Sequence, residues 1–144
     1  MQPKVERYLK DEDMNRIDHA LGHPVDPIKP TYREHFATDD QKEKAQFRAS
    51  PFWTGGQTSG DMAFFFVTKQ GRAALKEHLQ SIGDKTRLFN VSITYDRETF
   101  SDLVPAETHG KARYSKYLSF TDCIDMPFGK FCKISSVQIA KEAA

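Results

Sequence analysis

Residues 51–71 read PFWTGGQTSGDMAFFFVTKQG, and this stretch decides the fold of the first half of the chain. It places four of the eight glycines between or beside SPFW and MAFFFVT, whose aromatic and β-branched residues suit a pleated surface. The polar segment between them predicts a wide β-hairpin turn, because glycine permits positive φ angles. A phosphate-binding loop would place its glycines between a strand and a helix, with Lys and Ser or Thr directly after them. Here Lys69 comes only after the second strand, so the pattern favours a plain hairpin.

Helices are expected on both sides of this hairpin. After it, Thr68 is a suitable N-cap and Gly83 a suitable end for a helix. The spacing of its apolar residues places them on one face of the helix; these residues are Leu75, Leu79 and Ile82. Before the hairpin, a short amphipathic helix carries Met14, Ile17 and Leu21 and is stopped by Gly22 and Pro24. Thr31 is expected to cap a further helix with Tyr32 and Phe36 facing inward, and Asp39-Asp40 to start another that carries Phe47.

After Gly83 the apolar period changes from about 3.6 residues to 2. LFNVSITY (residues 88–95) predicts a half-exposed strand, and LVPAE (103–107) a short edge strand, since Pro105 cannot donate to a ladder. THGKARYSKYLSFTD (108–122) predicts a helix, and a last strand is expected around Val137 and Ile139. The apolar face expected for the helix is Tyr114, Tyr117, Leu118 and Thr121.

These elements predict an α+β protein. Residues 1–83 form an N-terminal winged-helix-like helical module with a β-hairpin, and residues 84–144 form a strand-strand-helix-strand module packed on it. The alternative is that both parts share one compact domain, which a chain of 144 residues permits.

Composition narrows the class of protein. The 21 basic and 20 acidic side chains give a formal net charge of +1, so the chain lacks the basic excess typical of phosphate-backbone binding. No apolar run approaches the length of a membrane span, and the charged start MQPKVERYLKDEDMNR has no signal-peptide core. Cys123 and Cys132 form no CxxC pair, which favours reduced thiols. We therefore expect a soluble protein of the cytoplasm that makes no membrane contact.

The titratable residues give little sign of chemistry. His19 and His23 have i, i+4 spacing, but Gly22 and Pro24 end the helix there, so surface or capping roles are favoured over a metal site. The acidic runs Asp11-Glu12-Asp13 and Asp39-Asp40 lie in polar segments, and exposed carboxylates with ordinary pKa values are poor general acids at neutral pH. We expect no catalytic residue, no metal, no cofactor and no enzyme activity.

Several segments resemble a group of small, mostly uncharacterised phage and prophage proteins. In this chain the resemblance rests on Ala20-Leu21-Gly22, on YREHF (32–36), on FVT followed by Gly71 and Ala74-Leu75, and on a KARY-type segment at 110–131. The hairpin with its VTxxGxxAL helix is also similar to the wing and last helix of winged-helix domains. The resemblance implies an accessory protein of a bacteriophage that works in the cytoplasm of the host cell. It implies no chemistry.

The aromatic residues exceed what one small core needs. In AFFFVT alternate side chains point to opposite faces, so if Phe64 and Phe66 face the core, Phe65 faces outward or into the other module. Packing of the two halves on each other explains this, and so does a binding surface, because aromatic and basic residues form interface hot spots. The expected partner-binding residues are Phe52, Trp53, Gln57, Phe65, Arg72, Lys111, Arg113 and Lys116.

The favoured function is that of a non-enzymatic phage protein that binds a host macromolecule, a protein or a ribonucleoprotein complex. An inhibitor of a host defence complex that acts by steric blocking, of the anti-CRISPR kind, is one such protein. The first alternative is a winged-helix DNA-binding regulator, in which Lys69, Arg72 and Lys76 or the basic residues of 111–116 contact nucleic acid. The second is a small enzyme whose site is assembled only by folding.

Overall fold

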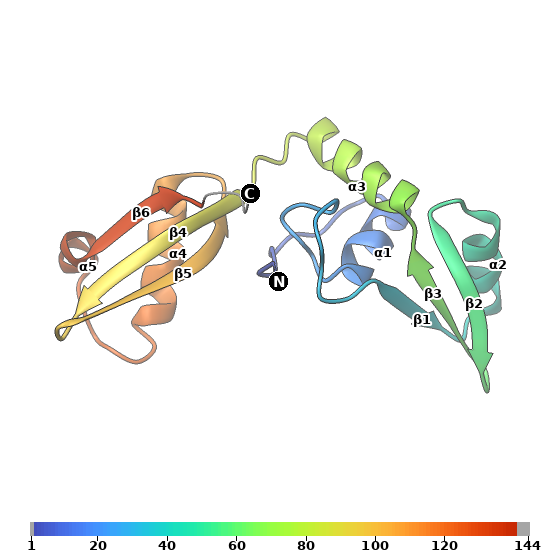
Figure 1. Cartoon of the computed structure of the whole chain (residues 1–144), viewed down its shortest axis with the longest axis horizontal. Helices are drawn as coiled ribbons and strands as arrows, with labels where there is room; N and C mark the ends of the chain where they lie inside the picture. Colours follow the sequence, from blue (N-terminus) through green and yellow to red (C-terminus); the bar gives the residue numbers. More distant parts are fainter. Residues whose placement is uncertain (1, 141–144) are drawn as a thin grey trace. The chain divides into compact units, whose positions relative to one another are not determined.

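A computed structural model describes residues 2–140 of the chain (Figure 1). The chain divides into two compact units, Met1–Asp84 and Lys85–Ala144, where the sequence placed the boundary one residue earlier. The described residues form five helices and two three-stranded antiparallel sheets, so the α+β class is confirmed. The winged-helix arrangement within the first unit stays a prediction.

The N-terminal unit alternates helices and strands around one sheet. Its strand order is β1-β3-β2, and both pairings are antiparallel. Its elements are α1 (Glu12–Ala20), β1 (His35–Thr38), α2 (Gln41–Ala49), β2 (Trp53–Ser59), β3 (Met62–Val67) and α3 (Lys69–Ser81).

Side-chain caps fix where the three helices of this unit begin. The side chains of Asp11, Asp40 and Thr68 accept hydrogen bonds from backbone N–H groups of the first turns of α1, α2 and α3. The predicted cap Thr68 and the helix start after Asp39-Asp40 are thereby confirmed. In α3, Leu75 and Leu79 are buried as expected, whereas Ile82 lies at the C-cap and is 55% exposed.

The helix expected from Thr31 is wrong. Residues 35–38 form β1, in which Phe36 lies opposite Phe65 of β3, and Tyr32 is exposed. Helical spacing of Tyr32 and Phe36 suggested an inward face, but pairing with the edge of β3 gives this segment more backbone hydrogen bonds than one isolated helical turn would.

The orientation predicted for the three phenylalanines of β3 is reversed. Phe65 is 1% exposed and shares the helix-covered face with Ala63 and Val67, while Phe64 and Phe66 lie on the opposite face. The ring of Phe65 lies 5.0 Å from that of Phe47 of α2, measured between centroids. Alternation along a strand fixes which residues share a face, but the choice of face depends on where the helices pack.

The glycine-rich segment is a bulged hairpin. The register of β2 against β3 shifts between Gly55 and Gln57, and Gly55 and Gly56 both have positive φ angles. A Cβ atom on Gly56 would lie 3.2 Å from the Phe65 ring. The buried Lys44 of α2 donates to the carbonyl oxygen of Asp61 in the turn, at 2.5 Å. These glycines therefore allow close packing at the bulge. The hydrogen bond from Lys44 fixes the turn of the hairpin to α2.

The C-terminal unit has one sheet with helices on a single face. Its strand order is β5-β4-β6, again antiparallel. The elements are β4 (Arg87–Tyr95), β5 (Glu98–Ala106), α4 (His109–Phe120), α5 (Phe128–Ile134) and β6 (Ser135–Ile139). Its core consists of Phe89, Val91, Ile93, Val104, Ala112, Met126 and Phe131.

The predicted strands β4 and β6 and the predicted helix α4 are present, with three differences from the prediction. The strand β5 is longer than the LVPAE segment, and α5 was missed because it has seven residues and no side-chain cap at Pro127. In α4 the fully buried residue is Ala112, and Tyr117 of the expected apolar face packs against the core, whereas Tyr114 and Leu118 of that face are exposed. A small residue faces the sheet here because it lets the helix approach closely.

Candidate interaction surfaces

The aromatic residues expected to anchor a partner lie mainly in the core of the N-terminal unit. Trp53 is 7% exposed and Phe65 is 1% exposed. Phe52 is half-buried and packs against the same core, and its carbonyl oxygen accepts from the backbone N–H of Thr68 at 2.9 Å. Among the four predicted residues of β2, β3 and the segment just before β2, Gln57 alone is exposed, and it lies on the opposite face of the sheet. In this conformation Trp53 and Phe65 stabilise the core of the unit and are not accessible to a partner.

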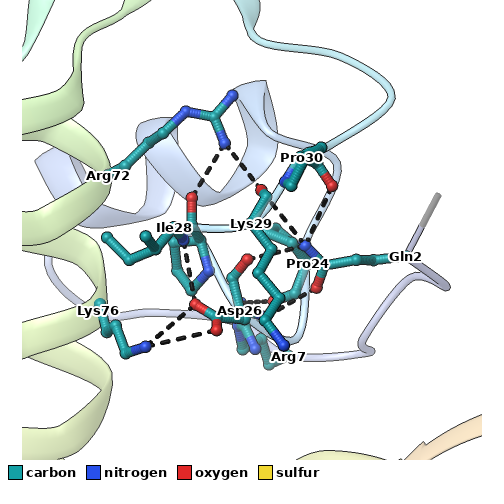
Figure 2. A network of polar contacts seen from close by, with 10 residues as sticks. Gln2, Arg7, Pro24, Asp26, Ile28, Lys29, Pro30, Arg72 and Lys76 are labelled. Atoms are coloured by element: carbon teal, nitrogen blue, oxygen red, sulfur yellow. Dashed lines mark hydrogen bonds and ion pairs between the residues drawn. The ribbon is translucent and has the colours of Figure 1, made fainter. Parts of the chain in front are cut away.

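Arg72 holds a loop of its own unit. Its guanidinium group donates to the carbonyl oxygens of Pro27 (3.0 Å) and Lys29 (3.2 Å) and to the hydroxyl of Thr31 (3.1 Å). Figure 2 shows the two contacts of Arg72 with carbonyl oxygens beside the ion pair of Lys76 with Asp26, at 3.3 Å. Arg72 and Lys76 of α3 are therefore engaged with the 26–31 loop, whereas Lys69 at the start of the helix is exposed.

The predicted basic residues of α4 also have partners inside the C-terminal unit. Lys111 pairs with Glu107 at 3.3 Å, and Lys116 pairs with Asp102. Arg113 donates to the hydroxyl of Ser135 at 3.2 Å and to its carbonyl oxygen at 3.4 Å. The sequence placed these three cations on one helix correctly, but it gave no signal of their partners, which are distant in sequence except for Glu107.

Three large apolar side chains form an exposed aromatic patch on the two helices of the C-terminal unit. Tyr114 and Leu118 of α4 are 50% and 51% exposed, and Phe128 of α5 is 37% exposed. The rings of Tyr114 and Phe128 meet edge to face, 5.5 Å between centroids. Tyr117, half-buried beneath them, donates its hydroxyl to the carbonyl oxygen of Met126 at 2.7 Å. The patch is thus held by a hydrogen bond and ring contacts.

The charged side chains on the two helices that form the aromatic patch are all basic, while Asp122 and Asp125 are exposed in the connection between these helices. The helices α4 and α5 contain no Asp or Glu. Their cations are Lys111, Arg113, Lys116, Lys130 and Lys133. Within residues 2–140, Lys130 and Lys133 are exposed on α5, the helix that contributes Phe128. A partner surface complementary to this one would be apolar at its centre and acidic at its rim.

A second apolar area lies on the uncovered face of the N-terminal sheet. On the central strand β3, Met62 and Phe64 are half-buried and Phe66 is 40% exposed. His35 of β1 lies opposite Phe66, with 6.5 Å between ring centroids, and Gln57 of β2 lies opposite Phe64. The outward aromatic side chains that the sequence predicted for β3 are therefore present, one residue away on either side of Phe65.

The most buried polar cluster is centred on Asp18. Its carboxylate is fully buried and accepts from Arg7 at 2.6 and 3.0 Å, and its Oδ2 lies 2.9 Å from Nδ1 of His23. Nearby, partial desolvation of the His19 ring lowers its pKa, and the positive charge of Arg33 lowers it further. Among residues 2–140, no three His, Cys, Asp or Glu side chains are grouped so as to hold a metal ion. This cluster ties the N-terminal segment to α1.

An open depression of about 350 Å³ lies between α1 and α2. It is lined by Asp13, Gln46, Phe47, Ala49, Ser50 and Trp53, so one carboxylate is its only ionisable group.

Of the two cysteines, Cys123 is exposed and Cys132 is half-buried, and both are free thiols. In the part of the chain that the structure describes, no helix is both long and apolar enough to cross a membrane.

Comparison of the chain with protein-family models, with curated proteins and with solved structures finds no match.

Proposed function

We propose that this protein acts by binding another protein through the aromatic patch Tyr114, Leu118 and Phe128. The observation that carries the proposal is the exposure of these three adjoining side chains on one helical layer. A contiguous exposed apolar area rimmed by polar groups is typical of interaction sites, and Tyr is among the residues that dominate interface energies. No reaction chemistry is part of the proposal.

The electrostatics favour a protein partner over duplex DNA. Arg72, Lys111 and Lys116, which a DNA-binding regulator would need for phosphates, are engaged with carboxylates or carbonyl oxygens of their own unit. A helix-turn-helix joins its two helices by three or four residues. Among residues 2–140 the shortest helix-to-helix connection is the segment 121–127. An acidic protein surface matches the exposed Lys130 and Lys133 of α5, the helix that contributes Phe128 to the patch.

The nature of the partner follows from the resemblance to phage accessory proteins. On this basis we propose that the partner is a protein or ribonucleoprotein of a bacterial host. Within that class, the function we propose is inhibition of a defence complex by steric blocking, the mode of action of anti-CRISPR proteins. Steric blocking requires only a complementary surface, which the aromatic patch supplies.

The proposal is tested by affinity capture from bacterial lysate with matched variants of the full chain. Leu118→Ser alters the patch, and Leu103→Ser is its control, because Leu103 is 48% exposed on the uncovered face of the sheet of the same unit. We expect one specific partner to be recovered with the wild type and with Leu103→Ser, and lost with Leu118→Ser. Equal recovery with all three proteins, or no specific partner, would contradict the proposal.

The DNA-binding alternative is separated by a gel-shift titration at two salt concentrations. Tight binding to duplex that weakens steeply as salt rises would favour the regulator, since counterion release makes phosphate contacts salt-dependent. We expect no such complex at physiological salt.

A further inference from the structure

We propose that the free edge of β6 pairs with the β6 edge of a second copy of this chain, joining two C-terminal sheets into one six-stranded sheet. This inference is independent of the aromatic patch, which lies on the helices. Among the described residues no strand pairs with the outer edge of β6.

The backbone of β6 presents a regular set of hydrogen-bonding groups at this edge. Ala140 donates its N–H to the carbonyl oxygen of Leu88, at 3.0 Å. Because hydrogen-bonding directions alternate along an antiparallel strand, Gln138 and Ser136 also face β4. The N–H and C=O groups of Ser135, Val137 and Ile139 therefore point away from the sheet.

These outward groups match themselves under a two-fold axis. An antiparallel pair centred on Val137 places Val137 opposite its copy and Ser135 opposite Ile139, so all the outward residues coincide in one register. That register forms up to six backbone hydrogen bonds from a strand of five residues. The carbonyl oxygen of Ser135 also accepts from Arg113, at 3.4 Å, and its second lone pair remains for the partner strand.

The side chains of β6 suit this pairing. The strand SSVQI carries no charge and no proline. No charged side chains would therefore face each other between the two copies of β6. On the uncovered face Ser136 would lie opposite Gln138 of the other copy, as two neutral groups that can hydrogen-bond. On the helix-covered face, the 49% exposed side chain of Ile139 would lose part of its exposure.

The other sheet edges of the described residues are protected against such pairing. The strand β5 carries Glu98 and Asp102 and has Pro105, which lacks an N–H group. The strand β2 is interrupted by the bulge at Gly55 and Gln57, and β1 has only four residues. Natural proteins blunt exposed edges with charge, proline, bulges or short length. The edge of β6 is short and its first residue, Ser135, is contacted by Arg113, but the strand has no charged residue, no proline and no bulge. It is therefore the edge best suited to a partner strand, and a second copy supplies a strand of the matching register.

The test is sedimentation equilibrium of the full chain at concentrations from about 1 µM to about 500 µM, since an interface of this small size gives at most a moderate affinity. We expect a concentration-dependent monomer–dimer equilibrium. A wild type that stays monomeric over the whole range overturns the proposal, including the case in which the edge takes up a strand of another protein.

Charge variants test the register. Ser136→Lys with Gln138→Lys places like charges opposite each other twice across the axis, which should raise the dissociation constant about 2- to 30-fold. Ser136→Glu with Gln138→Lys places opposite charges at the same two points and should leave the dimer intact. Mixing the double-lysine protein with Ser136→Glu, Gln138→Glu should give a heterodimer. A dimer that the double-lysine change leaves unaffected, or that both sets of changes weaken equally, overturns the proposed pairing.

Ile139→Pro removes an outward N–H group without touching the ladder to β4, and Pro is tolerated at such edge positions. We expect this variant to be monomeric with an unchanged far-ultraviolet circular dichroism spectrum. A folded variant that still forms the dimer would exclude β6 from the contact.

Discussion

Gly71→Ala tests how closely α3 packs on the segment before β2. Gly71 lies in the first turn of α3, where a Cβ atom would be 2.6 Å from the carbonyl oxygen of Phe52 and 2.9 Å from a methyl carbon of Val67. That carbonyl oxygen already accepts from the N–H of Thr68 at 2.9 Å, and the hydroxyl of Thr68 donates to the carbonyl oxygen of Pro51 at 2.8 Å. The backbone is thus fixed from two sides and cannot move aside freely.

The magnitude follows from three contributions. Replacing glycine by alanine within a helix stabilises it by about 1 kcal/mol. Against this, an added methyl group in a filled site costs about 1–3 kcal/mol, and lengthening the hydrogen bond from Thr68 costs about 1 kcal/mol. We therefore expect the free energy of unfolding to fall by about 1–3 kcal/mol.

The assay is urea unfolding followed by the fluorescence of Trp53, the only Trp of the chain, which is buried in the same unit. The matched control is Ala73→Gly, at an exposed position of the same helix, which should cost about 1 kcal/mol through helix propensity alone. If Gly71→Ala instead stabilised the protein by the amount that the control loses, the close contact with Phe52 would be refuted.

Three further predictions concern the N-terminal unit. Phe65→Ala should cost about 3–5 kcal/mol because Phe65 is 1% exposed, whereas Phe66→Ala should cost clearly less; similar costs in urea unfolding would mean that the faces of β3 are misassigned. Asp18→Asn should cost about 3 kcal/mol, the low end for breaking a buried pair, because Arg7 loses its fully buried partner and keeps the ion pair with Asp84 at 3.5 Å; a loss below 1 kcal/mol would show that solvent reaches the pair. Since partial desolvation and the charge of Arg33 lower the pKa of His19, the unfolded chain binds a proton there more readily than the folded one, so stability falls as pH drops below about 6.5. The variant His19→Gln should lose less stability than the wild type between pH 7.5 and 5.5, and identical pH profiles by thermal unfolding would contradict this.

The sequence predicted those elements whose signals are local. Thr68 as a cap, the helix start after Asp39-Asp40 and the alternation in LFNVSITY each depend on residues within one element, and the structure has them in place. The strand β1 was missed because residues 35–38 become a strand only through pairing with β3. No pattern within four residues carries that information.

The candidate site was predicted less well, for a related reason. Alternation identifies Phe65 as different from its neighbours, but only the positions of α1, α2 and α3 decide that Phe65 is the buried one. Likewise Tyr114 and Leu118 share a helical face, and spacing alone does not distinguish a buried face from an exposed one. Ala112 was the available signal, because the residue nearest to a closely packed sheet is often small.

The pairing of the basic residues bears directly on the choice between partners. A protein that neutralises Z phosphates gains affinity by releasing counterions in proportion to Z. Here Lys111 and Lys116 would have to exchange Glu107 and Asp102 for phosphates, which returns two carboxylates to solvent without a partner and offsets much of that gain. An apolar partner surface makes no such demand, because burying Tyr114, Leu118 and Phe128 leaves both ion pairs intact. The exposed Lys130 and Lys133 of α5 then act at the rim, where they select a partner by the sign of its charge more than they add to affinity.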